Sequence, residues 1–165
     1  MNVQEATTRR LPDLKERHLP ENCRETINTI LKETYGYEQF RNLEIYDDLS
    51  KGKEKLCISQ GQLIENVILE AEKAWKSETQ VDNILLTAPT GSGKSLLFQL
   101  PAIYLGKEYN LLTIVVSPLK ALIVDQVESL QELGYARVAY ASSDLSPEQK
   151  MEVYRQVREG AVSYT

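Results

Sequence analysis

One short segment combines glycines, a lysine and a serine at a spacing that suits phosphate binding. The segment reads Ala88-Pro89-Thr90-Gly91-Ser92-Gly93-Lys94-Ser95. Gly91 and Gly93 permit backbone angles at which successive N–H groups point toward one anion, while Lys94 adds a cation and Ser95 a hydroxyl. The strict form of this pattern has glycine where Ala88 stands, and an ordinary glycine-rich turn is the alternative interpretation.

The flanking elements must place these groups at the beginning of a helix. An apolar run from Asn83 to Thr87 precedes the loop, and a helical pattern from Ser95 to Leu105 follows it. A helix N-terminus adds positive charge to the N–H groups of such a loop. We therefore expect Lys94 at the β- and γ-phosphates of ATP and Ser95 in the shell of a Mg²⁺ ion, as the catalytic pair. The candidate phosphate contacts are Thr90, Gly91, Ser92, Gly93, Lys94 and Ser95.

Short apolar runs and helical patterns alternate along the second half of the chain. The expected order is strand 83–87, helix 95–105, strand 111–117, helix 120–133, strand 137–141 and helix 147–158. This order predicts an α/β fold with a parallel sheet flanked by helices. Pro101 is expected to end or kink its helix near Leu100. The tail 161–165 either begins a fourth strand or hangs free, and we expect a sheet that is incomplete at the C-terminus.

Local signals mark the ends of the other helices. Glu21 to Tyr35 has helical spacing, and Gly36 follows as a stop. Ser146 is an N-cap with Gln149 as its capping-box partner, and Gly160 ends that helix. A second helix has one apolar face, formed by Leu63, Ile64, Val67, Ile68, Ala71 and Trp75.

Composition sets limits on the class of protein. The 165 residues are 42% hydrophobic and 26% charged, which is typical of one soluble globular domain. Apolar runs are too short for a membrane span and the N-terminus is not signal-like, so we expect no membrane and a cytoplasmic location, with nucleoid or nucleus as alternatives. Cys23, Cys57 and His18 cannot form a zinc site, and both thiols are expected to be reduced. The net charge of −5 gives no support to nucleic-acid binding, so any DNA contact has to be local.

Two stretches resemble known helicase motifs. Residues 90–102 and 115–122 resemble motifs I and Ia of superfamily 2 helicases, and the RecQ family is the most similar. Asp125-Gln126 and Ser142-Ser143 fit the same order. The resemblance implies a RecA-like P-loop NTPase fold and a parent that is an ATP-dependent DNA helicase. In that family motifs Ia and Ib touch the DNA backbone, and the matching positions are Ser117, Pro118, Lys120, Ser142 and Ser143.

DNA, single-stranded or at a duplex junction, is therefore the implied partner, although a solvated first-turn lysine is the alternative for Lys120. The segment from Leu31 to Arg41 is similar to the start of the RecQ adenine-recognition motif, which implies that Tyr37, Phe40 and Arg41 contact the base or ribose. The family's glutamine should follow within a few residues, yet here the candidates lie after an insertion. They are Gln62, which we assign, and Gln60 as the alternative. Ordinary packing against the following helix is the other interpretation of the two aromatic residues.

These expectations divide the chain into three regions. Residues 1–20 form an irregular arm, 21–82 a helical adenine-recognition region with an insertion loop near 42–59, and 83–165 the N-terminal part of a RecA-like domain. The sequence contains no Asp-Glu pair, so the acidic motif II of the family is missing. We expect ATP binding with negligible hydrolysis. A non-catalytic nucleotide-binding regulatory or interaction module is the alternative, and a small-molecule kinase is disfavoured because no acceptor site or lid follows Ser117.

Overall fold

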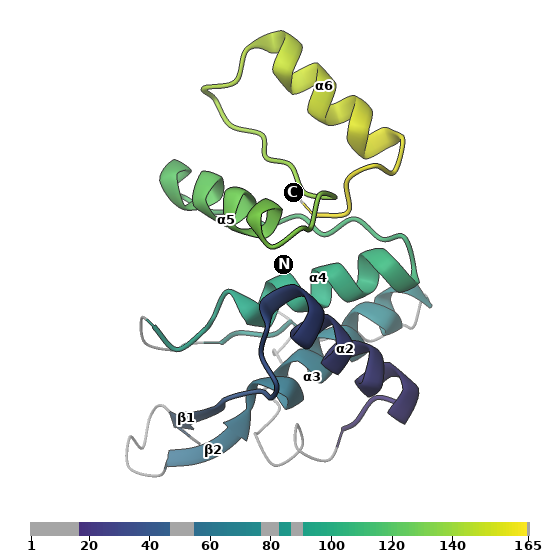
Figure 1. The fold of residues 1–165 in the computed structure, drawn as a ribbon, viewed down its shortest axis with the longest axis vertical. Helices are drawn as coiled ribbons and strands as arrows, with labels where there is room; N and C mark the ends of the chain where they lie inside the picture. Colours follow the sequence, from purple (N-terminus) through teal and green to yellow (C-terminus); the bar gives the residue numbers. More distant parts are fainter. Residues whose placement is uncertain (1–16, 47–54, 77–82, 87–90, 165) are drawn as a thin grey trace, which may run out of the picture. The chain divides into compact units, whose positions relative to one another are not determined.

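The computed structural model describes residues 17–46, 55–76, 83–86 and 91–164. Its elements, labelled in Figure 1, are α2 (Glu21–Tyr35), β1 (Asn42–Tyr46), β2 (Lys55–Ser59), α3 (Gln60–Trp75), α4 (Leu96–Glu108), α5 (Lys120–Glu132) and α6 (Pro147–Arg158). The chain divides into two compact units, Met1–Glu25 with Gln39–Pro101 and Thr26–Glu38 with Ala102–Thr165. Each unit has its own set of buried apolar side chains.

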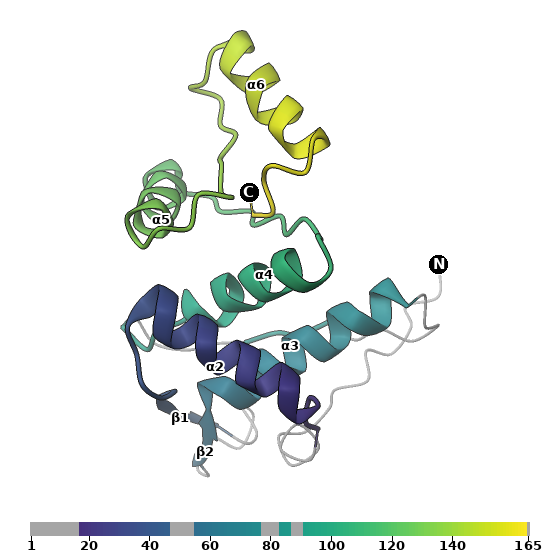
Figure 2. The same ribbon diagram turned by 45° about the vertical axis from the view of Figure 1, so that its right-hand side comes forward.

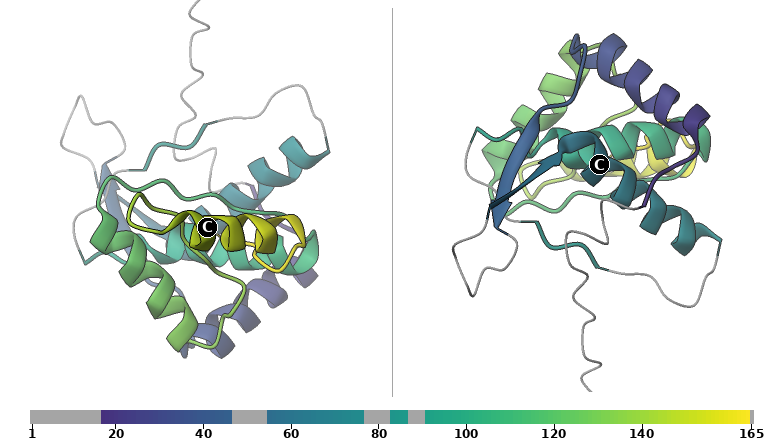
Figure 3. Two further views of the ribbon diagram at one scale, coloured as in Figure 1. Left: turned by 90° about the horizontal axis from the view of Figure 1, so that it is seen from above. Right: turned by 90° about the horizontal axis from the view of Figure 1, so that it is seen from below.

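The first unit contains an antiparallel hairpin where the sequence predicts an insertion loop. Strands β1 and β2 pair from Asn42↔Ser59 to Tyr46↔Lys55, and Figure 3 (right) shows β2 leading into α3. Leu43 and Ile58 face each other and are both buried, at 8% and 1% exposure. One buried cross-strand pair is enough to orient two short strands, but it is too short a pattern to be recognised in the sequence.

Helix α3 follows the hairpin and agrees with its sequence pattern except at its end. Ser59 caps it in a capping box with Gln62, and the buried apolar positions are Leu63, Ile64 and Ile68. Trp75, which we expected on the buried face, is 58% exposed. It is the last residue of the helix, where the buried stripe has already ended.

Two carboxylates of α3 hold the chain that precedes α2. Glu70 Oε1 accepts from Arg17 Nη2 at 2.6 Å and from Lys73 Nζ at 3.1 Å, and Glu65 Oε2 accepts the Leu19 N–H at 3.0 Å. Both glutamates are buried, so their charges are balanced by hydrogen bonds instead of water. Residues 17–20 are therefore anchored, although they form neither helix nor strand.

The second unit joins three segments in parallel through one tyrosine. Tyr164 forms parallel bridges to Thr113 and to Val138. The Thr113 N–H donates to Ser163 O at 2.9 Å, and the Ala139 N–H donates to Tyr164 O at 3.1 Å. The tail thus lies between two predicted strands instead of hanging free. Tyr164 is 2% exposed, and burial raises its pKa to about 12.

These bridges are isolated, and the predicted parallel sheet is only partly visible. Within the described residues, the named strands are β1 and β2 alone. Residues 83–86 are not in a strand, and Thr87 lies outside the described residues. Parallel sheets are normally covered on both faces, whereas Ile114 and Val116 are 67% and 91% exposed here. The complete parallel sheet stays a prediction.

Three predicted helix ends are confirmed. A helix end near Leu100 is not observed, and the alternative of a kink at Pro101 stays a prediction. Gly36 and Gly160 have φ values of 69° and 70° after α2 and α6, and the Ser146–Gln149 capping box begins α6. Figure 2 shows α5 and α6 joined by a long loop. Helix α4, however, continues through Pro101 to Glu108. Proline removes one backbone hydrogen bond, and the surrounding residues, including Leu100 and Ala102, are buried in helical conformation despite this loss.

The described helices contain none that is both long enough and apolar enough to cross a bilayer. Cys23 and Cys57 are free thiols.

A close approach in the second unit requires a glycine on α4. A Cβ built at Gly106 would lie 2.6 Å from Ser163 Oγ and 2.7 Å from Ser163 Cβ. Ser163 is buried and shares a hydrogen bond with the Tyr135 hydroxyl. The missing side chain at Gly106 therefore lets the segment that carries Tyr164 lie against the helix.

Gly106→Ala tests this contact, because alanine normally favours a helix over glycine by about 1 kcal/mol. Here the clash with Ser163 makes the substitution destabilising instead of stabilising. We expect the free energy of unfolding, measured by urea denaturation, to fall by about 1–3 kcal/mol. The double variant Gly106→Ala/Ser163→Gly, which restores space, should recover part of this loss. A stabilised single variant would contradict the contact.

Candidate functional site

The described part of the glycine-rich loop has the backbone that its sequence predicts. Gly91 and Gly93 have φ values of 81° and 78°, which side chains strongly disfavour. Lys94 and Ser95 form the turn before α4, since the Leu97 N–H donates to Lys94 O at 3.0 Å and the Gln99 N–H to Ser95 O at 2.9 Å. The loop therefore runs directly into a helix N-terminus. Ala88, Pro89 and Thr90 lie outside the described residues.

The hairpin brings together two positions that the insertion separates in the sequence. The Gln60 N–H donates to Arg41 O at 2.9 Å, and Gln60 Oε1 accepts the Arg41 N–H at 3.1 Å. This contact continues the β1–β2 register by one residue beyond Asn42↔Ser59. Arg41 and Gln60 are thus neighbours in space, although β1 and β2 separate them along the sequence.

The Gln60 amide also reaches the phosphate loop. Its Nε2 donates to Ser92 O and to Gly93 O, both at 3.3 Å, and the residue is 3% exposed. A Cβ at Gly93 would lie 2.5 Å from Nε2, so only glycine permits this approach without a shift. Gln62 Oε1 instead accepts the Ser59 N–H at 3.2 Å in the helix cap. The geometry therefore favours Gln60, the alternative from the sequence, as the glutamine beside the loop.

The aromatic candidates have different surroundings. The Phe40 ring lies over Gly61, where a Cβ would be 2.7 Å from Cδ2. This contact is the packing against the first turn of α3 that the sequence leaves as an alternative. Tyr37 belongs to the second unit, is 48% exposed and stacks on Tyr35 with ring centroids 6.4 Å apart. Burial and neighbouring tyrosines raise the pKa of Tyr35, so its hydroxyl stays protonated.

A cavity of about 730 Å³ opens in the first unit. It lies between one face of α3, residues 83–86 and the start of α4, and Lys94 is among its lining residues. Most of the lining is aliphatic or aromatic, including Leu63, Leu97 and Phe98. Such a surface suits apolar groups better than phosphates.

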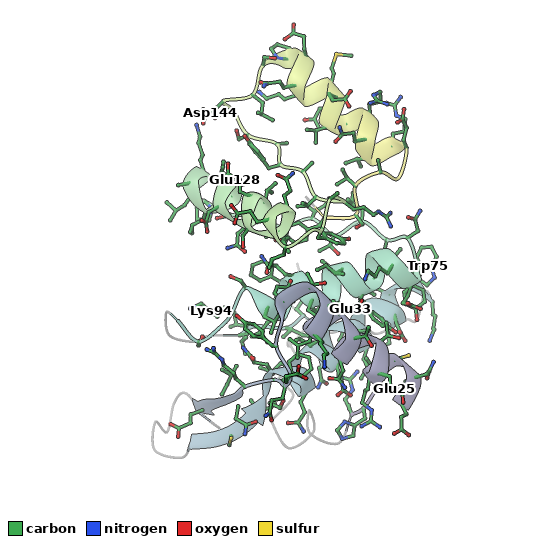
Figure 4. All side chains as sticks on the ribbon, viewed as in Figure 1. Glu25, Glu33, Trp75, Lys94, Glu128 and Asp144 are labelled. Carbon is green, nitrogen blue, oxygen red and sulfur yellow. The ribbon has the colours of Figure 1, made fainter. Side chains whose placement is uncertain are left out.

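A second group of candidate residues gathers at the N-terminus of α5. Lys120 Nζ donates to Asp144 Oδ1 at 2.6 Å, and Ser143 Oγ lies 3.4 Å from the same oxygen. Ser142 Oγ accepts the Asp144 N–H at 3.3 Å. Three of the residues expected to face DNA, Lys120, Ser142 and Ser143, therefore form one cluster, and Figure 4 labels Asp144 within it.

The remaining two candidates, Ser117 and Pro118, lie just before α5, where Ser117 Oγ accepts the Leu119 N–H at 3.4 Å. Hydrogen bonding from Lys120 lowers the pKa of Asp144, with smaller contributions from Ser143 and Lys150. Sequence reasoning missed Asp144, because an acid carries no signal for a DNA-facing surface.

Comparison with known proteins identifies the family. A sequence profile described as DEAD/DEAH box helicase matches residues 68–164. The chain belongs to this family, and among its members it is RecQ-like.

The relatives agree with this placement. The chain is 32% identical over 132 residues to the "ATP-dependent DNA helicase RecQ" of Synechocystis sp., an overlap of 80% of the chain and 21% of the relative. It is 30% identical over 138 residues to "ATP-dependent DNA helicase Q-like 5" of Arabidopsis thaliana, covering 84% and 12%. For the RecQ helicase of Bacillus subtilis the identity is 31% over 133 residues, covering 81% and 17%. The chain thus spans about a fifth or less of each relative's length.

Replacement of the two glutamines separates their roles. Gln60→Ala removes a buried amide with partners in two segments, and we expect the free energy of unfolding to fall by about 1–3 kcal/mol. Gln62→Ala removes a helix-cap hydrogen bond for which water can substitute. We expect it to lower the free energy of unfolding by less than about 1 kcal/mol. Urea denaturation of both variants, with hydrogen exchange at Gly93 and Lys94, measures the difference. Equal losses would contradict the linking role of Gln60.

Proposed function

We propose that this chain binds Mg-ATP and forms the nucleotide-binding part of an ATP-dependent DNA helicase, in which hydrolysis drives translocation and unwinding. The observation that carries the proposal is the Gln60 amide, which links Arg41 to the carbonyls of Ser92 and Gly93. A single side chain thereby connects the segment that resembles an adenine-recognition motif to the phosphate loop. The relatives named above, which are ATP-dependent DNA helicases, support the same function.

The Gln60 amide has the capacity to recognise adenine. A primary amide offers two N–H groups and an oxygen with two lone pairs. Arg41 occupies one lone pair, and the two long contacts to Ser92 and Gly93 are consistent with one shared N–H. The remaining N–H and lone pair match N7 and the N6 amino group of adenine, and because Gln60 is 3% exposed, the nucleotide has to open this side of the amide to reach them. Guanine presents an acceptor in place of that amino group, so ATP is preferred to GTP.

The phosphates would be held by the loop. Thr90, Gly91, Ser92 and Gly93 supply backbone N–H groups, Lys94 supplies charge to the β- and γ-phosphates, and Ser95 supplies a ligand to Mg²⁺. Arg41 is exposed and lies beside Gln60, so it is better placed than Phe40 to contact the base or the ribose. The packing of Phe40 on Gly61 favours a supporting role for its ring, and Tyr37 stays a candidate for stacking.

DNA would contact the cluster at the N-terminus of α5. Lys120 and the hydroxyls of Ser117, Ser142 and Ser143 are groups that bind backbone phosphates without reading sequence. Because the whole chain carries a net charge of −5, such a contact depends on this local surface. A nucleotide-binding regulatory or interaction module without hydrolysis is the second candidate, and it would hold if the parent protein lacked motif II and a second RecA-like domain.

Ligand-induced stabilisation tests the nucleotide site. Mg-ATP at a hundred times its dissociation constant should raise the free energy of unfolding by about 2.7 kcal/mol, and Mg-GTP at the same concentration should raise it less. Lys94→Ala should remove the effect, whereas Lys107→Ala, an exposed lysine at the other end of α4, should leave it. No stabilisation by Mg-ATP, or equal stabilisation of Lys94→Ala, would overturn the site.

Hydrolysis tests the division between binding and catalysis. Phosphoryl transfer to water requires a positioned nucleophile and charge compensation that Lys94 and Ser95 alone do not provide. We expect the 165-residue chain to release no phosphate from Mg-ATP above background, with or without single-stranded DNA. Steady release that Lys94→Ala abolishes would show that this chain contains a complete catalytic site.

A further inference from the structure

The ion pair between Lys120 and Asp144 places an acid among the residues expected to face DNA. Nζ and Oδ1 are 2.6 Å apart, and Ser143 Oγ lies 3.4 Å from the same carboxylate oxygen. A lysine ammonium and a serine hydroxyl are also the groups that hold a backbone phosphate. The carboxylate therefore receives the contacts that a phosphate oxygen would receive.

The loop before α6 does not depend on this ion pair for its shape. Ser142 Oγ accepts the Asp144 N–H, and the Ser146–Gln149 capping box fixes the start of α6. The Asp144 side chain is 67% exposed and that of Lys120 is 56% exposed. An exposed ion pair of this kind contributes little to folding stability, so a stronger anion can displace the carboxylate without disturbing the fold.

We propose that the Asp144 carboxylate occupies the position of a DNA-backbone phosphate against Lys120 and Ser143, and that DNA must displace it in order to bind. The inference rests on the proposed DNA contact of this surface and adds an internal competitor to it. Asp144 weakens binding in two ways, because it neutralises Lys120 and repels the incoming phosphate. An acid at this position thus limits the grip on DNA, and a weaker grip permits release during stepwise movement.

Asp144→Asn is the direct test, because it keeps the shape and the hydrogen-bonding oxygen while removing the charge. Fluorescence anisotropy with a labelled oligothymidylate at low ionic strength measures the affinity of the full chain. We expect Asp144→Asn to bind about threefold to fivefold more tightly than the unaltered chain, with the gain decreasing as salt is added. Asp144→Ala should give a gain in the same direction.

Glu128→Gln is the matched control, since Glu128 is an exposed acid on the same helix as Lys120 and its replacement changes the net charge equally. Figure 4 labels both acids. The effect of Glu128→Gln on the affinity for DNA should stay below about twofold. A double-mutant cycle completes the design, because in a Lys120→Ala background the Asp144→Asn gain should fall to the level of the control.

The outcomes separate this inference from the proposed function. If all chains bind DNA but Asp144→Asn and Glu128→Gln give equal gains, the competition is wrong and the DNA contact stands. If Asp144→Asn increases the affinity just as much in the Lys120→Ala background, the competition is likewise wrong and the DNA contact stands. If neither the unaltered chain nor Asp144→Asn binds the oligonucleotide at low ionic strength, the proposed DNA contact is itself wrong, and the competition falls with it.

Discussion

The hydrogen bonds of the Gln60 amide hold the first unit's candidate site together. The amide accepts from Arg41 and donates to Ser92 and Gly93, so the hairpin, the start of α3 and the phosphate loop share one buried polar side chain. A buried amide without partners would destabilise the fold, and for this reason the three segments are restrained together.

Glycines make the close contacts possible in both units. At Gly93 a side chain would collide with the Gln60 amide, and at Gly106 with Ser163. Only the first has a positive φ, so the two positions use glycine for different reasons: backbone conformation together with space at Gly93, and space alone at Gly106. Helix propensity disfavours Gly106 inside α4, and the packing of Ser163 against it outweighs that preference.

The sequence by itself determined the features that depend on neighbouring residues. Capping residues and glycine stops act within one turn, so the end of α2 and both ends of α6 could be predicted from the local pattern. The positive φ values of Gly91 and Gly93 follow equally from local sequence. The family also follows from short motifs, because the phosphate loop and the segment around Lys120 each lie within a few consecutive residues.

Only the tertiary structure decided the features that depend on distant partners. The hairpin pairing, not the spacing along the chain, puts Gln60 beside Arg41 and leaves Gln62 in the helix cap. Likewise, Tyr164 is placed by backbone bonds to segments that lie far from it in the sequence. Asp144 meets Lys120 across an intervening helix and loop, so its competition for a phosphate position is invisible in the sequence. Such contacts join residues that are far apart in the sequence, so the local sequence pattern does not reveal them before the chain has folded.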